Sequence, residues 1–192
     1  MRLPDPLQLN DHALILSPSG NIEEYMVHDT VTILREWGLK PVISKYAIGK
    51  RGRFSGTVEE RLHDLQKAFD DPLLKLIICS RGGYGAVHLL EKINFNGIRK
   101  NPKWVVGYSD ITAIHSVLQV NGIASLHAPM AKHFSDEGVN DLSVRYTKSI
   151  LSGQSVLYEI PVVENFTFNR QGRAIGKLFG GNLSVLSGII GT

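Results

Sequence analysis

The chain has 192 residues, 43% of them hydrophobic and 20% charged, a composition that suits one globular domain with the beginning of a second. Its net charge of +3 is small, and Lys and Arg are scattered among Asp and Glu, which argues against a nucleic-acid-binding surface. Cys79 is the only cysteine, so an intrachain disulfide and a thiolate metal cluster are both excluded.

Strand-like apolar runs alternate with helical periodicity in the first part of the chain. We expect a strand at residues 13–16, a helix at 22–37 that Gly38 ends, and a short second strand at 41–43. The charged, glycine-containing segment 49–53 is either a solvated loop, the commoner case for such a segment, or a loop that reaches a substrate. The alternation of strands and helices predicts a parallel sheet covered by helices.

A capping box begins the next helix, because Thr57 at the N-cap is followed three residues later by Glu60. Leu65 and Phe69 belong to the buried face of that helix. The run at 73–79 is the most apolar so far, and its continuous hydrophobicity predicts a central strand that is covered on both faces.

The glycine loop, Arg81-Gly82-Gly83-Tyr84-Gly85, follows that strand. Its glycines allow backbone conformations that a side chain would forbid, and they let main-chain N–H groups face a ligand. The pattern is compatible with a cradle for an oxyanion or a phosphate, and equally with a tight strand-to-helix turn. A single helical stretch from Ala86 to about Arg99 is expected to follow.

The most informative segment is 105–112, where an apolar run stops at Gly107-Tyr108-Ser109-Asp110 and a helix begins. Ser109 lies at the turn, so its hydroxyl would be lifted above the end of a sheet, beside free helix N–H groups, as in serine hydrolases. The alternative is that Ser109 or Asp110 merely caps the helix. We expect a strained elbow at Ser109, with Gly107 relieving the crowding before it.

The glycine loop and Ser109 strengthen each other as a candidate site. Each follows an apolar strand, and a right-handed crossover between the strands brings both to the carboxyl edge of one sheet. A serine nucleophile beside glycine N–H donors is half of an acyl-transfer site, because the donors hold the charge that develops on the attacked carbonyl oxygen. Such a site also needs a base.

Several segments together carry a family resemblance. They are Ser17-Pro18-Ser19-Gly20, Phe54-Ser55-Gly56-Thr57 with Arg61, Phe69-Asp70-Asp71-Pro72, Arg81-Gly82-Gly83-Tyr84-Gly85, Gly107-Tyr108-Ser109-Asp110-Ile111-Thr112, His127-Ala128-Pro129-Met130 and Gly180-Gly181-Asn182-Leu183. In this order and spacing they resemble the LD-carboxypeptidase family, which includes muramoyl-tetrapeptide carboxypeptidase and the microcin-immunity serine peptidases. The resemblance implies a flavodoxin-like (class I glutamine-amidotransferase-like) parallel α/β sheet with helices on both faces.

The activity that the resemblance implies is that of a cytoplasmic serine peptidase without metal or other cofactor. Such an enzyme removes the terminal D-alanine from a murein tetrapeptide, cutting an L,D bond during cell-wall recycling. Ser109 would be the nucleophile, and the backbone N–H of Asp110 with one from Gly82 or Gly83 would form the oxyanion hole. The residues expected to contact the substrate are Arg81, Tyr84, Tyr108 and His127. The family has Gly where this chain has Ala128, a small change that leaves the assignment standing.

The resemblance leaves the catalytic triad incomplete. In the family a Glu and a His from a C-terminal domain complete it, and neither is present here, so we expect residues 1–192 to be an incomplete fragment with little or no activity. His115 follows Ser109 by six positions, which on a helix rotates it away from the serine. A strand-end histidine such as His127 is more often structural than a base. The other histidines lack metal-ligand spacing, which argues against a zinc peptidase.

The last part of the chain bears on domain organisation. The expected elements are a helix at 140–151, a strand at 156–160, a second strand at 166–168 and a turn at 171–172. We expect an α/β nucleophile domain at 1–165, followed at 166–192 by a linker and the first strands of an incomplete, β-rich C-terminal domain.

Two other classes of function stay open. The chain could be a non-enzymatic α/β module that binds an anionic ligand with its two glycine-containing loops. It could also be a shortened interaction protein that pairs with a copy of itself, as a homodimer, or with a full-length relative. The N-terminal residues lack the charged-then-apolar order of a secretory signal, and no apolar run has membrane-spanning length. We therefore expect a cytoplasmic protein with neither membrane nor nucleic-acid partners.

Overall fold

The computed structural model describes residues 1–158 and 172–191, and its centre is a five-stranded, parallel sheet with strand order β2-β1-β3-β4-β5. The strands are β1 (His12–Leu16), β2 (Lys40–Ile43), β3 (Leu74–Cys79), β4 (Trp104–Gly107) and β5 (Leu126–His127). This is the flavodoxin-like order, in which the direction of winding reverses between β1 and β3. The expected fold class is confirmed.

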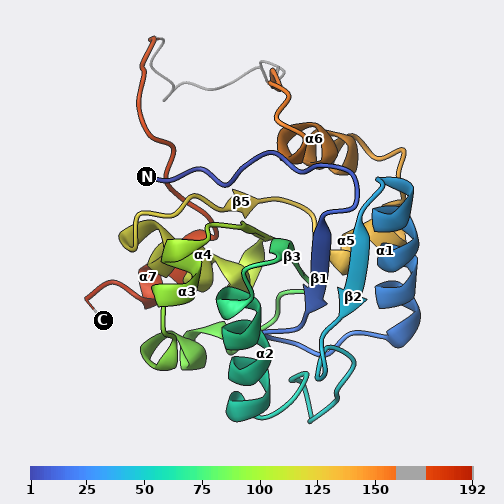
Figure 1. Cartoon of the computed structure of the whole chain (residues 1–192). Helices are drawn as coiled ribbons and strands as arrows, with labels where there is room; N and C mark the ends of the chain where they lie inside the picture. Colours follow the sequence, from blue (N-terminus) through green and yellow to red (C-terminus); the bar gives the residue numbers. More distant parts are fainter. Residues whose placement is uncertain (159–171, 192) are drawn as a thin grey trace, which may run out of the picture.

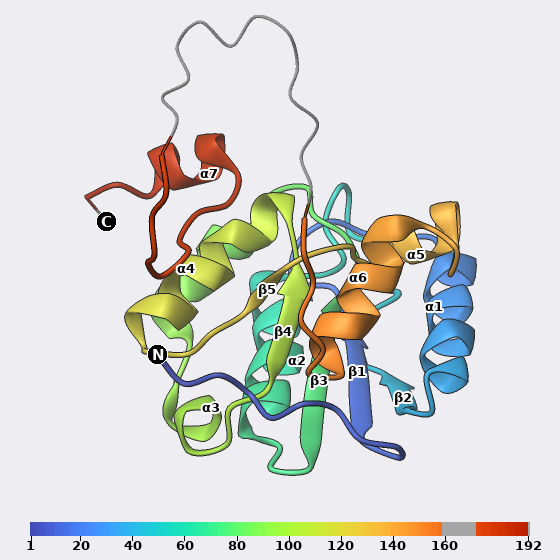
Figure 2. The ribbon, with the colours of Figure 1, turned by 90° about the horizontal axis from the view of Figure 1, so that it is seen from above.

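Helices cover both faces of the sheet (Figures 1 and 2). The α-helices are α1 (Glu24–Glu36), α2 (Val58–Asp70), α3 (Asn96–Lys100), α4 (Thr112–Val120), α5 (Ala131–Glu137), α6 (Leu142–Leu151) and α7 (Leu183–Gly188), and two short 3₁₀ helices are η1 (Ala86–Lys92) and η2 (Ser109–Ile111). α2, α3 and α4 pack on one face, and α1, α5 and α6 on the other. None of the described helices is both long and apolar enough to cross a membrane.

β3 lies at the centre of the sheet, as its continuous hydrophobicity predicts. Ile77 and Cys79 contribute to the core beneath α2 and α4, whereas Leu76 and Ile78 belong to the core on the opposite face. All four side chains are fully buried. Alternate side chains of a strand point to opposite faces, so a central strand needs apolar residues for both faces; within β3 only the half-buried Lys75 departs from this pattern.

The helix ends follow the expected local chemistry. Thr57 Oγ1 accepts from the Glu60 N–H at 3.1 Å, and the Glu60 carboxylate accepts from the Thr57 N–H at 2.8 Å, so the capping box is confirmed. Gly38, with φ +83°, ends α1. These local signals fix where α1 and α2 begin and end.

The expected single helix from Ala86 to about Arg99 is wrong, because η1 and α3 are separate elements. The break falls at Asn94, whose backbone N–H and carbonyl both bond to the Gln66 side chain, at 2.8 and 2.9 Å. The Asn94 side chain accepts from the Asn96 N–H at 2.9 Å, which makes a local turn that competes with helix. A contact from α2 thus overrides the helical periodicity.

The C-terminal strands are not found where the structure describes the chain. Residues 156–158 of the expected strand 156–160 are not in a strand, and its remaining residues lie outside the described part, as do the strand 166–168 and the boundary between 1–165 and 166–192. Residues 172–182 form neither helix nor strand, and the helix α7 follows. The expected strand is therefore wrong at residues 156–158, since a strand needs a hydrogen-bonded neighbour and no strand among the described residues pairs with this segment.

Candidate active site

Three loops meet at the carboxyl edge of the sheet, on either side of the point where the winding reverses. They are Ser17–Gly20 after β1, the glycine loop Arg81–Gly85 after β3, and Tyr108–Ser109 after β4. The Gly20 N–H donates to the Gly82 carbonyl at 3.1 Å, which ties the first loop to the second. Ligands of open parallel sheets bind at this kind of crevice. The expected placement of the glycine loop and Ser109 at one edge is present in the structure.

Ser109 occupies a strained elbow. Its φ of +61° lies in the left-handed region, while Tyr108 before it is extended, with φ −149° and ψ −174°. This conformation costs a serine about 1 to 3 kcal/mol, and such strain gathers at functional sites. A Cβ at Gly107 would lie 2.9 Å from the Ile111 side chain, so the glycine before the elbow is required. The strained elbow is confirmed.

Neither residue of the elbow caps the helix behind it. η2 and α4 have no side-chain cap hydrogen bond at their N-termini. The Asp110 carboxylate, 5% exposed, instead accepts from the Ser19 hydroxyl at 2.5 Å and from the Ala86 N–H at 2.9 Å. The capping alternative for Ser109 and Asp110 is therefore wrong, and the serine hydroxyl is left at the surface of the elbow.

The glycine loop lies directly against the elbow. A Cβ on Gly82 would be 2.9 Å from the Ser109 Cβ, 3.0 Å from its Oγ and 3.4 Å from the Asp110 nitrogen. Gly83 follows with φ +123°, a conformation that other residues rarely adopt. Within the described residues the N–H groups of Gly83 and Asp110 donate to no protein acceptor. An unused N–H on the elbow and another on the residue that follows Gly82 are the kind of donors that stabilise an oxyanion.

Arg61 lies buried beneath the glycine loop, with 2% of its surface exposed. Its Nη1 donates to the carbonyls of Pro18 and Gly85 at 2.7 and 2.9 Å, and its guanidinium stands 5.1 Å from the centre of the Phe54 ring. Burial lowers the pKa of Arg61, and the nearby Asp110 carboxylate opposes that shift. The sequence marks Arg61 only as part of a motif, so its role under the loop was missed.

His115 supports the end of β4 from behind. Its Nε2 donates to the Gly107 carbonyl at 2.9 Å, and its Nδ1 accepts from the Ser125 hydroxyl at 2.8 Å, which fixes the neutral tautomer. Burial lowers the pKa of His115 to about 4, so the ring is neutral near pH 7. The expectation that His115 points away from Ser109 agrees with these contacts.

His127 ends β5 and is exposed. Its ring contacts those of Tyr108 and His115, with centroids 6.2 and 6.1 Å away. Across residues 1–158 and 172–191, no histidine or carboxylate is hydrogen-bonded to the Ser109 hydroxyl. The described part of the chain therefore presents a serine hydroxyl and unused backbone N–H groups without a base in contact with the hydroxyl.

Two other residues expected to contact the substrate, Arg81 and Tyr84, belong to the glycine loop itself. Arg81 donates to the Asn21 carbonyl at 3.1 Å, and Tyr84 is exposed, with its ring against Phe54. The Arg53 guanidinium lies 5.2 Å from the centre of the Tyr84 ring, so the charged segment 49–53 ends beside the glycine loop. Of the two alternatives for segment 49–53, a solvated loop or a loop that reaches a substrate, the position of Arg53 at this rim favours the second.

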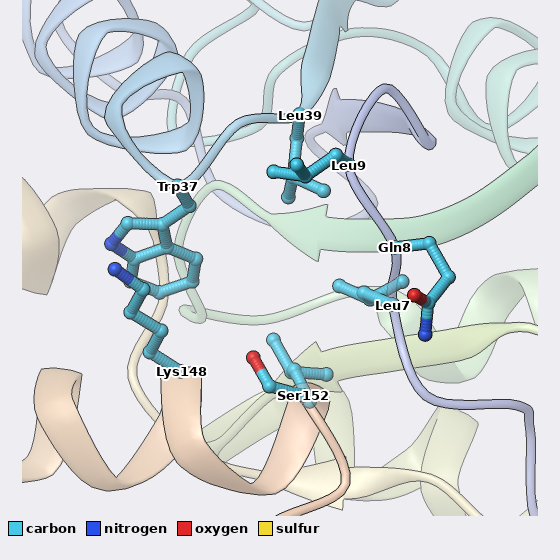
Figure 3. A pocket seen from close by; sticks show the side chains of 8 residues that line it. Leu7, Gln8, Leu9, Trp37, Leu39, Lys148 and Ser152 are labelled. Carbon is cyan, nitrogen blue, oxygen red and sulfur yellow. The ribbon is translucent and has the colours of Figure 1, made fainter.

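Of two hollows on the surface, one lies near the carboxyl edge of the sheet and the other at the opposite edge. One, of about 310 Å³, lies beside the end of β5 and is lined by His127, Pro129, Tyr146 and Tyr158, among others. The other, of about 180 Å³, is lined by Leu7, Trp37, Leu39 and Lys148 (Figure 3) and lies where β1 and β2 begin, at the opposite edge from Ser109. In the described part of the chain, no group of three or more His, Cys, Asp or Glu side chains could hold a metal ion.

Comparison with known proteins gives consistent matches. A family model described as the LD-carboxypeptidase N-terminal domain matches residues 14–128. A putative carboxypeptidase of Synechocystis is 38% identical over 190 residues, and a probable murein peptide carboxypeptidase of Bacillus subtilis is 32% identical over 193 residues. Each match covers 98% of this chain and 60% of the relative, so the chain spans less than two thirds of the length of either protein.

A solved structure of an MccF-like protein from Bacillus anthracis has a TM-score of 0.72 at 30% identity. The superposition covers 79% of this chain and 47% of that one. The fold and the sequence motifs thus point to the same group of proteins.

Proposed function

Because the chain belongs to the LD-carboxypeptidase family, we propose that it acts as a serine carboxypeptidase on murein peptides, with Ser109 as its nucleophile. The observation that carries this proposal is the left-handed elbow at Ser109, which lies against Gly82 and beside the unused N–H groups of Gly83 and Asp110. The substrate that the resemblance favours is a murein tetrapeptide with a terminal D-alanine. The bond cut would be the L,D bond before that residue.

In the proposed reaction the Ser109 hydroxyl attacks the carbonyl of the bond to the terminal D-alanine. The N–H groups of Asp110 and Gly83 stabilise the negative charge on the carbonyl oxygen. D-alanine leaves, and water then hydrolyses the acyl-serine. The base is assigned by family resemblance to a Glu and a His of a C-terminal domain, because no base contacts Ser109 in the described residues.

Substrate choice needs its own test, because MccF-like proteins also belong to the matched group. The experiment is release of D-alanine, measured with the protein expressed from its complete gene. The substrates are a murein tetrapeptide and a matched pentapeptide ending in a D,D bond. Ser109→Ala is the test variant, and Ser116→Ala, which removes a nearby hydroxyl of α4, is the matched control.

We expect turnover of the tetrapeptide, little turnover of the pentapeptide, and loss of activity in Ser109→Ala alone. Tetrapeptide turnover that survives Ser109→Ala would contradict the proposed nucleophile. Binding of an anionic ligand without turnover, unchanged in Ser109→Ala, would favour the non-enzymatic module. A cytoplasmic location and a homodimer accompany the proposed activity as predictions, and analytical ultracentrifugation checks the second.

A further inference from the structure

Two loops of the site are each held by the same two buried charges. Arg61 bonds to the carbonyls of Pro18 and Gly85. Asp110 accepts from the residues that directly follow them, through the Ser19 hydroxyl and the Ala86 N–H. Arg61 therefore holds the carbonyl groups of both loops, and Asp110 holds a hydroxyl or N–H donor of the next residue in each.

The two charges lie close enough to interact but are not paired directly. Asp110 raises the pKa of Arg61 against the effect of burial, while the Arg61 Nε has no hydrogen-bond partner in the described residues. A buried charge is costly without compensation, and each ion here is compensated by hydrogen bonds and by the other ion. Removal of either charge should therefore disturb both loops.

Asp110 has a second connection to the site. Its backbone N–H is one of the two proposed oxyanion donors, and its carboxylate binds Ala86, which follows the glycine loop directly. The carboxylate therefore links the donor on the elbow to the loop that supplies the donor of Gly83. The spacing of the two donors depends on this link, because no hydrogen bond among the described residues joins Gly82 or Gly83 directly to Ser109.

We propose that the Asp110 carboxylate is a positioning residue that, together with Arg61, sets the distance between the oxyanion donors on the elbow and on the glycine loop. This inference rests on the proposed function of Ser109. Oxyanion donors act only within a narrow range of distance to the developing charge, so a shift of the loop lowers kcat more than it weakens substrate binding.

The chain offers a matched control at Asp64. This carboxylate is also 5% exposed and also accepts from one hydroxyl and one backbone N–H, those of Ser44 and Tyr46, at 2.6 and 2.7 Å; its other oxygen lies 3.3 Å from the half-exposed ring of His63. Asp64 lies on α2, and its two donors lie in the turn after β2, so none of the three belongs to the elbow or to the glycine loop. Asp64→Ala and Ser44→Ala therefore remove comparable interactions without touching either oxyanion donor.

The experiment compares kcat and KM for D-alanine release in Asp110→Ala, Asp110→Asn and Ser19→Ala with the two control variants, using the protein from its complete gene. We expect Asp110→Ala to lower kcat about 100-fold and Ser19→Ala about tenfold, with KM changing much less than kcat. Asp110→Asn should recover part of the loss, because its amide oxygen can accept the same two hydrogen bonds. The controls should keep kcat within about twofold, since neither changes an oxyanion donor.

Equal kcat losses at Asp110 and Asp64 would overturn the positioning role, as would a loss confined to KM. If Asp110→Ala does not fold, Ser19→Ala is compared with Ser44→Ala instead, and equal kcat losses in these two variants would likewise overturn the positioning role. Failure of the proposed function gives a different result, because D-alanine release would then survive Ser109→Ala, and the positioning role would fall with it.

Discussion

Gly82 lies so close to Ser109 that a Cβ added to the glycine would stand 2.9 Å from the serine Cβ and 3.0 Å from its Oγ. Both atoms belong to the elbow, which cannot yield without moving the nucleophile. We expect Gly82→Ala to lower kcat about 100-fold, as a displacement near 1 Å does at a catalytic centre. D-alanine release measures the effect.

Gly176→Ala is the control for Gly82→Ala, because a Cβ there meets no atom within 4 Å and the glycine has no positive φ. The control should be as active as the unmodified protein. Full activity in Gly82→Ala would contradict the close approach of the glycine loop to the elbow.

The left-handed backbone of Ser109 predicts that replacement of this serine by glycine gives a more stable protein than replacement by alanine. Ser109→Gly relieves the strain at φ +61°, whereas Ser109→Ala keeps the Cβ and the strain. We expect Ser109→Gly to exceed Ser109→Ala in free energy of unfolding by about 0.5 to 1 kcal/mol, after the greater unfolded-state entropy of glycine is included. Urea denaturation of both inactive variants provides the comparison, and equal stabilities would argue against a strained elbow.

His115 predicts a pH dependence of stability. Burial lowers its pKa from 6.5 to about 4, so between these values the unfolded chain binds a proton that the folded chain does not. The free energy of unfolding should therefore fall as the pH decreases from about 6.5 to about 4, by a total on the order of 3 kcal/mol from this residue. Above pH 6.5, His115 should make no contribution to the pH dependence of the free energy of unfolding.

Chemical denaturation at pH 7 and pH 5 measures the contribution of His115. His115→Gln should weaken the pH dependence, because glutamine does not titrate. His12→Gln, at an exposed position, is the control and should leave the pH dependence of the free energy of unfolding unchanged. The same slope with pH in all three proteins would show that His115 is not buried in its neutral form.

The absence of a base in contact with Ser109, within residues 1–158 and 172–191, predicts slow turnover by the 192-residue chain alone. A serine hydroxyl is a weak nucleophile without a base, and loss of that base costs several orders of magnitude in rate. We expect purified residues 1–192 to release D-alanine at least about 10³-fold more slowly than the protein from its complete gene, the rate loss typical of triad-deficient proteases. Comparable rates would require a base within this chain, for which His127 is the first residue to substitute.

Features set by short-range pattern could be predicted from the sequence. The apolar run at β3 and the elbow at Ser109 each depend on residues close together in the chain, as does the capping box of α2. Periodicity, capping chemistry and a glycine next to a turn are enough to identify such elements. The rule for right-handed crossovers placed the glycine loop and Ser109 at one edge of the sheet, whereas the flavodoxin-like strand order was predicted only as what the family resemblance implies.

Features that depend on distant contacts could not be predicted. Ser19 and Asp110 are 91 positions apart, and nothing local to Asp110 shows that its carboxylate turns inward instead of capping α4. Likewise the break between η1 and α3 depends on Gln66, which lies on α2 and binds the backbone of Asn94. In both cases a polar contact with a residue distant in the sequence decides the local structure, and the local pattern does not show that contact.

The central claim, that Ser109 is the nucleophile, is tested most directly by covalent trapping. The protein from its complete gene is treated with a fluorophosphonate, digested with trypsin and analysed by mass spectrometry. We expect one adduct, on the peptide between Lys103 and Lys132, with fragment ions that place it on Ser109 and not on Ser116 or Ser125. Trapping should stop D-alanine release in proportion to labelling. An adduct on another residue, or full activity after Ser109 is labelled, would contradict the account.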